Sequence, residues 1–259
     1  MLKSDILGEG DMPNQFAKLD WQVQTLRVTA FPIDVPHMDE GWWDKLIPEP
    51  PEARVSRPKE GINEENGPFE NGKLILTTQP ARIDWIYTVD SEKSQDLPNL
   101  GSFYSTEGSF YDVVRKWLTI YHNIKRLAFG LILLFPVQNK IEGYSLISNY
   151  LPLFELDPVN SSDFFYQINR PRISTGSPPL MINRLSKWSV AKMQLFKIEL
   201  SGLEKAQPTI LEASYACRLE LDINNSPEGI DQLLIEKLVP LFDELYSIAN
   251  EISLDGDIK

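Results

Sequence analysis

The chain has 259 residues, of which 42% are apolar and 24% are charged, a composition that is typical of a globular protein and argues against disorder along its whole length. A formal net charge of −12 argues against general electrostatic attraction to nucleic acid or anionic lipid. Cys217 is the only cysteine, so neither an intramolecular disulfide nor a thiolate-rich metal site can form.

The hydropathy pattern argues against insertion into a membrane. Residues 1–10 alternate charged and apolar positions and contain no apolar core of signal-peptide length. The longest apolar run, residues 127–137, is interrupted by Gly130 and Pro136 and is far shorter than the ~20 residues that span a bilayer. We therefore expect a soluble, cytoplasmic protein without membrane partners.

The first half of the chain predicts strands followed by one clear helix. We expect a strand over 21–31, a short helix over 39–47, and a hairpin formed by residues 73–78 and 81–88. Residues 47–72 contain five prolines among many glutamates, so we expect a surface excursion there and not a central strand. A helix is expected to begin at Ser109, where Ser109 and Asp112 match a capping box and apolar residues follow at helical spacing.

The second half predicts further strands and a C-terminal helix. We expect a buried strand over 127–135, a short helix over 144–151, and strands over 164–169, 180–188, 190–200 and 210–223. The last helix should begin with Ser226 as its N-cap and Pro227 at its first position. Pro240 should kink or split this helix, and the chain should fray from Asp255.

This pattern predicts the fold class. Strands separated by hairpin-length gaps, with only two long helices, favour an α+β fold with a mostly antiparallel sheet and the two helices packed on one face. The regular alternation of strands and helices that a parallel sheet needs is missing. We expect a single domain over residues 1–259, with the Pro/Glu-rich excursion at about 47–72 on its surface.

Three short motifs connect the chain to a known group of proteins. Residues 81–85 have the sequence ARIDW in the expected hairpin, residues 126–129 have RLAF, and residues 218–223 have RLELDI before the C-terminal amphipathic helix. From about residue 75 to its end, the chain resembles a sporadically distributed family of uncharacterised bacterial proteins of about this length. The resemblance implies an α+β fold and a bacterial origin, and it carries over no catalytic residues.

The sequence contains no recognisable set of catalytic or metal-binding residues. His37 and His122 lie in unrelated segments, and neither has a second ligand at metal-site spacing. Cys217 is expected to be a small apolar residue in a strand. The TGS sequence at 175–177 follows two arginines and is a weak match to an anion-binding loop. We therefore expect no metal, no cofactor and no catalytic residue, although the protein's status as a non-enzyme stays open.

Two pairs of charged residues share a strand face. Arg82 and Asp84 are expected to form a structural ion pair. Glu220 and Asp222 could bind a metal in the manner of metal-dependent nucleases, but Arg218 lies on the same face and a solvated strand is the simpler interpretation.

The charge distribution provides the one candidate binding site. Residues 164–198 contain six Lys or Arg residues and no Asp or Glu, and we call this segment the basic island. Cations can position phosphates, and aromatic rings can stack on bases. The same cations could instead face acidic residues of the chain itself, such as those of the 40–70 segment or the C-terminal helix. The residues that we expect to bind a partner are Arg170, Arg172, Arg184, Lys187 and Trp188.

Taken as a whole, the sequence predicts a non-enzymatic binding or assembly component of a bacterial multi-protein system. It would engage a macromolecule, most simply a protein or a second copy of itself, through the sheet and the basic island. The alternative is a nucleic-acid-binding protein, or a metal-dependent carboxylate enzyme that acts on nucleic acid. A third possibility, a binder of a small ligand, requires a pocket between the sheet and the helices.

Overall fold

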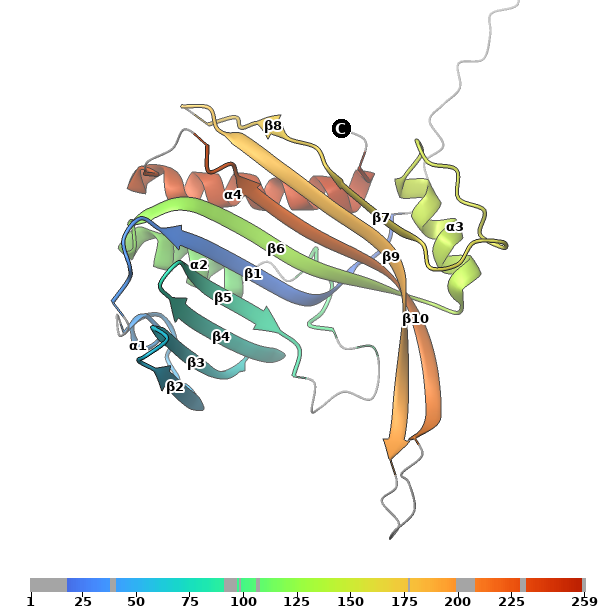
Figure 1. Cartoon of the computed structure of the whole chain (residues 1–259), viewed down its shortest axis with the longest axis horizontal. Coiled ribbons are helices and arrows are strands. Elements are labelled where there is room, and N and C mark those ends of the chain that lie inside the picture. The colour runs from blue at the N-terminus through green and yellow to red at the C-terminus, as the bar shows by residue number, and fades with distance from the viewer. Residues whose placement is uncertain are drawn as a thin grey trace, which may run out of the picture.

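The fold is α+β, and the residues that the structure describes form ten strands in one sheet and four helices (Figure 1). The computed structural model describes residues 18–37, 41–90, 97, 99–105, 108–176, 178–198, 208–228 and 232–257, with the backbone alone for 194–198 and 208–213. None of the helices in this part of the chain is long and apolar enough to cross a membrane.

The strands form one antiparallel sheet, which confirms the predicted class and strand orientation. Their order across the sheet is β2-β3-β4-β5-β1-β6-β10-β9-β7, and β8 also pairs with β9. The bounds are β1 Gln22–Pro32, β2 Ala53–Arg57, β3 Ile62–Phe69, β4 Gly72–Gln79, β5 Arg82–Thr88, β6 Ile124–Val137, β7 Phe165–Asn169, β8 Arg172–Ile173, β9 Met181–Ile198 and β10 Pro208–Asn225.

The helices are α1 (Trp42–Leu46), α2 (Ser109–Ile120), α3 (Lys140–Tyr150) and α4 (Ile235–Asp255). Figure 1 shows α2 and α4 behind the strands, and Phe129 of β6 has ring contacts with Tyr111 of α2 and Phe242 of α4. The expectation of two long helices on one face is not confirmed in that form. The 11-residue α3 is nearly as long as the 12-residue α2, and its Tyr150 contacts Trp188 of β9.

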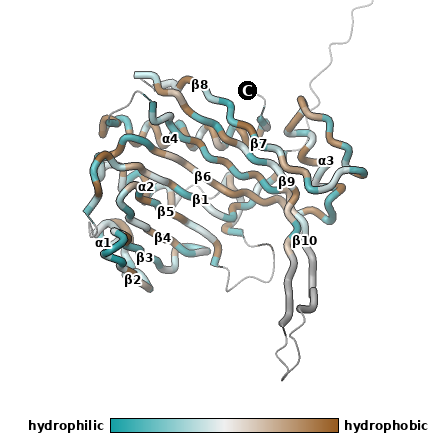
Figure 2. Tube along the Cα trace, viewed as in Figure 1, coloured by the Kyte–Doolittle hydropathy of each residue, from teal (hydrophilic) through white to brown (hydrophobic). Residues whose placement is uncertain are grey.

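Alternation along the strands separates a buried face from a polar face. In β5, Ile83, Trp85 and Tyr87 are buried, and Trp85 and Tyr87 contact aromatic rings of α2. Arg82 and Asp84 lie on the opposite face, where their 2.6 Å ion pair confirms the predicted pairing. Figure 2 shows hydrophilic and hydrophobic residues alternating along the strands. The face away from α2 and α4 is therefore the polar face of the sheet.

Two stretches contain more strand than the sequence predicts. Residues 47–72 form β2 and β3 at one end of the sheet; their prolines lie outside the ladder apart from Pro68, near the end of β3. Two strands are predicted over 180–188 and 190–200, but residues 181–198 form the single strand β9, because β10 pairs with it on both sides of Ser189. Continuous pairing of β9 with β10 thus overrides the local break at Ser189.

Both predicted N-terminal caps are wrong. Helix α2 begins at Ser109 itself, after Gly108, with no side-chain cap. Helix α4 begins at Ile235 and not at Ser226, because the Ser226 amide donates to the carbonyl of Met181 and extends the end of the β9–β10 pair. Pro240 lies inside α4, which continues through it without a split.

The residues after α4 are packed against the domain and are not frayed as far as Asp257. Gly256 ends the helix with φ of 80°, a left-handed conformation that favours glycine. The Asp257 amide donates to the carbonyl of Tyr150, and its carboxylate accepts a hydrogen bond from Arg170. This C-terminal turn therefore joins α4 to α3 and to the chain after β7.

We predict that Gly256→Ala destabilises the fold, because the added Cβ would overlap the Tyr150 carbonyl and the backbone would be strained. The expected loss in the free energy of unfolding is about 2–4 kcal/mol, measured by urea denaturation. Gly176→Ala is the matched control, since its Cβ would have only one neighbour, 3.9 Å away; it should change stability by less than about 0.5 kcal/mol. Equal stabilities of the two variants would contradict this role of Gly256.

Candidate binding surfaces

The cations of the basic island are divided between the two faces of the sheet. Strand alternation places Arg184 and Trp188 on the face covered by the helices and Lys187 on the polar face, where it lies opposite Glu220 of β10. Arg170 follows β7, and Arg172 belongs to β8. The five predicted binding residues therefore do not form one continuous surface.

Acidic residues at the end of α4 bind the three arginines. Arg172 donates to Glu251 at 2.8 Å, and Arg184 lies 3.6 Å from the same carboxylate. Arg170 donates to Asp257 at 3.2 Å, and this hydrogen bond raises the pKa of Arg170. Of the alternatives open from the sequence, these contacts correspond to pairing with the C-terminal helix.

Arg184 and Trp188 are buried among core residues. The Arg184 side chain is only 3% exposed, and burial, with the neighbouring charge of Arg172, lowers its pKa. Trp188 has no exposed surface and contacts the rings of Trp21 and Tyr150. Stacking of Trp188 on a nucleobase would require these ring contacts to open, and partner binding by the basic island stays a prediction.

The predicted carboxylate pair lies on the polar face and is surrounded by cations. Glu220 accepts hydrogen bonds from Lys187 at 2.7 Å and Arg218 at 3.0 Å. Burial alone would raise the pKa of Glu220, but the bonds from Lys187 and Arg218 outweigh it, and the pKa lies below its usual value. Asp222 lies 3.9 Å from Arg27 of β1. The two cations next to Glu220 therefore favour the charged form of its carboxylate.

Arg27 reaches Asp222 because a glycine lies between them. Gly130 of β6 is opposite Arg27 on one side and Asp222 on the other, and the Arg27 guanidinium occupies the space next to its Cα. No motif in the sequence marks Arg27 itself, and the one signal for this close approach is a glycine inside an apolar strand. The ion pair links three adjacent strands across the polar face.

The remaining candidates for chemistry do not gather into a site. Within the described residues, no three His, Cys, Asp or Glu side chains are placed to hold a metal ion. His37 and His122 are both exposed in connecting segments, and α2 ends before His122. Cys217 is fully buried in β10, which confirms its predicted place in a strand.

The longest strand pair continues beyond the rest of the sheet. β10 pairs with β6 only from Tyr215 onward, and β9 pairs with β7 only between Leu185 and Ser189. Residues 193–198 and 208–214 pair only with each other within the described part of the chain, and we call them the arm. Figure 1 shows the arm extending past the other strands and away from α2 and α4. Sequence analysis predicted strands here but not their projection.

Comparisons with known proteins identify no relative: no family model, curated protein or solved structure matches this chain.

We predict that Lys187→Met reduces stability in a pH-dependent way. Because the pKa of Glu220 is lowered in the folded state, its stabilising contribution is present at neutral pH and is lost as the pH falls through that pKa. Urea denaturation should show a loss of about 1 kcal/mol at pH 7. The loss should shrink as the pH falls toward about 3. Lys116→Met, on exposed α2 surface, is the control; a loss that does not depend on pH would contradict the role of Glu220.

Cys217 should be unreactive in the folded protein. Burial raises its pKa to about 12, and the thiolate is the reactive form. Labelling with a disulfide reagent at pH 8 should be at least ~100-fold slower in the folded protein than in denaturant. Labelling at the denatured rate would show that β10 opens readily or that the thiol is accessible.

Proposed function

We propose that this protein is a non-enzymatic binding component of a bacterial multi-protein assembly, acting in the cytoplasm. The arm carries this proposal, since it is a long two-stranded projection of the sheet with no neighbouring strand among the described residues. The partner that binds the arm would be a protein. The basic island has a supporting role in this proposal. Arg184 of β9 pairs with Glu251 of α4, and Arg170 and Arg172 pair with acids at the same end of the helix, so these contacts hold α4 against one of the strands from which the arm extends.

The energetics of a β-ribbon favour a partner. A two-stranded hairpin alone is at best marginally stable in water, and strands of 18 residues are far longer than the usual 5–6. Both outer edges of such a ribbon present unpaired backbone N–H and C=O groups, which another strand can pair with. A partner that adds a strand to the arm would satisfy these groups and order the ribbon.

The register of the arm favours a protein over a nucleic acid. Phe196 is opposite Ile210 and Ile198 is opposite Pro208, so apolar residues occupy alternate opposed positions, with Lys197 opposite Thr209 between them. A nucleic acid would instead require a row of cations.

Nucleic-acid binding is the second candidate, because Lys192 and Lys197 lie on β9 at or near the arm. A two-stranded ribbon can enter a major groove. The net charge of −12 and the pairing of Arg170, Arg172 and Arg184 with acids of the same chain weigh against it.

Shortening the arm tests the proposal. Lys192 and Tyr215 are directly opposed, so a two-residue Asn-Gly turn can replace residues 193–214 without disturbing the strands that pair with β6 and β7. We expect the shortened protein to keep its melting temperature within about 5 °C. A partner protein should copurify stoichiometrically with the full chain from its native host after nuclease treatment. The amount of this partner that copurifies with the shortened protein should be at least ~10-fold lower.

Arg170→Glu is the matched comparison for this experiment, because it removes an island cation but leaves the arm intact. It should lower stability by breaking the bond to Asp257 while keeping the copurifying protein. Equal recovery of the partner with the full and shortened arms would contradict the proposal. A salt-sensitive mobility shift with nucleic acid that disappears with the arm would also contradict it, and would favour the second candidate.

A further inference from the structure

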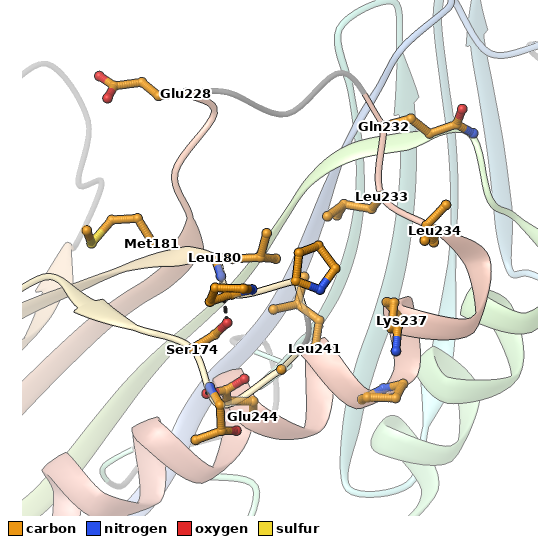
Figure 3. A pocket seen from close by; sticks show the side chains of 15 residues that line it. Ser174, Leu180, Met181, Glu228, Gln232, Leu233, Leu234, Lys237, Leu241 and Glu244 are labelled. Atoms are coloured by element: carbon orange, nitrogen blue, oxygen red, sulfur yellow. Dashed lines mark hydrogen bonds between the residues drawn. The ribbon is translucent and has the colours of Figure 1, made fainter.

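A cavity of about 610 Å³ lies beside the first turns of α4 (Figure 3). One wall is formed by residues 174–176 and 178–181, which lead from β8 into β9, and the other by residues 228 and 232–234 and one side of the helix. The helix contributes Lys237, Pro240, Leu241 and Glu244 to this wall, and Leu234 precedes them just before the helix begins. The volume falls within the range of about 300–1,000 Å³ that is typical of small-ligand sites.

Buried apolar side chains form the inner part of this cavity. Leu233 and Leu241 line it although they are only 4% and 5% exposed. Leu180 and three prolines add further apolar surface from both walls. Because the inner lining belongs to the core, a ligand would insert an apolar group and not merely rest on the surface.

The wall opposite α4 is held in place by hydrogen bonds. The Ser174 amide donates to the carbonyl of Leu180, and the Leu180 amide donates to the Ser174 hydroxyl at 2.8 Å. The Thr175 amide donates to Glu244 at 2.7 Å and ties this wall to α4. The predicted anion-binding loop at 175–177 thus uses the Thr175 amide for a carboxylate of the same chain, and Ser177 lies outside the described residues. The cavity is preformed, which lowers the entropic cost of binding.

Lys237 supplies an available positive charge at the cavity. It is exposed, lines the cavity, and forms no ion pair with any residue that the structure describes. Of the two acids in the lining, Glu244 is engaged by Thr175, and Glu228 lies at the opposite end of the group from Lys237 (Figure 3). The amino end of α4, which has no side-chain cap, adds positive potential near Lys237.

We propose that this cavity binds a small amphiphilic carboxylate, an aliphatic chain that ends in an acid group. The chain would occupy the apolar space between Leu180, Leu233 and Leu241, and the carboxylate would pair with Lys237. This pairing gives specificity for an acid over an alcohol of the same length. The site goes beyond the proposed function and is separate from the arm, so the variant with the shortened arm should bind the ligand as the full chain does.

Calorimetry with the full chain tests this site, using decanoate and decanol as probes. We expect decanoate to bind with 1:1 stoichiometry and at least ~5-fold more tightly than decanol. Lys237→Gln should lower the affinity for decanoate by ~5–10-fold and leave the affinity for decanol unchanged, because only the ion pair is removed. Lys116→Gln removes an exposed lysine far along the chain on α2 and should change neither.

A second pair of variants separates the cavity from its surroundings. Leu234 lines the cavity and is 53% exposed, whereas Ile235 is 44% exposed and does not line it. Leu234→Trp should therefore lower the affinity for both decanoate and decanol, because the larger side chain fills the cavity. Ile235→Trp should lower the affinity for neither.

Three results would overturn the proposal. They are the absence of decanoate binding at about 1 mM, equal affinity for decanoate and decanol, or decanoate binding that neither Lys237→Gln nor Leu234→Trp weakens. Association with vesicles that contain an anionic phospholipid, without binding of free decanoate, would also overturn it in favour of a lipid headgroup.

Discussion

The pairing of β9 with β10 is the interaction on which the rest of the structure depends. It runs from Ile182 opposite Asn225 to Ile198 opposite Pro208, with a single irregularity near Ile210. Because neighbouring residues of a strand point to opposite faces, this one register directs Arg184 and Trp188 toward the helices and Lys187 toward the polar face. The same ladder then leaves the sheet and becomes the arm. The buried charge, the polar face and the projection are therefore consequences of one strand pair.

The helix layer has to satisfy the cations that this register buries. A guanidinium removed from water is costly unless a carboxylate and hydrogen bonds compensate it. Glu251 of α4 forms ion pairs with both Arg172 and Arg184, and Asp257, just after the end of the helix, forms an ion pair with Arg170. The excess of acids in the C-terminal part of the chain thus complements the excess of cations in residues 164–198. Part of the charge asymmetry that resembles a binding site in the sequence is an internal contact in the folded chain, since Arg170, Arg172 and Arg184 pair with acids at or just after the end of α4.

The local features of the sequence predicted much of the fold. Alternating or helical periodicity located β1, the β4–β5 hairpin, α2 and β10, because each has one buried and one exposed face. The start of α4 was missed because the Ser226-Pro227 motif is local, whereas its amide is used by Met181 on a neighbouring strand. Ser189 resembled a break for the same reason: nothing near it in the sequence reveals that β10 bridges the position.

The candidate sites depended on contacts that no local pattern contains. Arg172 and Glu251 are 79 positions apart, and the cavity lining comes from residues 174–176, 178–181, 228, 232–234 and α4. Sequence periodicity assigns residues to a face of one element, but it does not pair the faces of elements that are distant in the chain. The third functional possibility raised by the sequence, a pocket between sheet and helix, could therefore be located only in the folded chain.

Hydrogen–deuterium exchange of the arm tests the central claim most directly. The amides of residues 193–198 and 209–214 should exchange rapidly in the isolated protein, since no neighbouring strand among the described residues supports their pairing. In the purified assembly the same amides should exchange at least ~10-fold more slowly, while amides of β10 that already pair with β6 keep their rates. Unchanged exchange of the arm in an assembly that contains this protein would contradict the account, because the arm would then not be the surface that the partner engages.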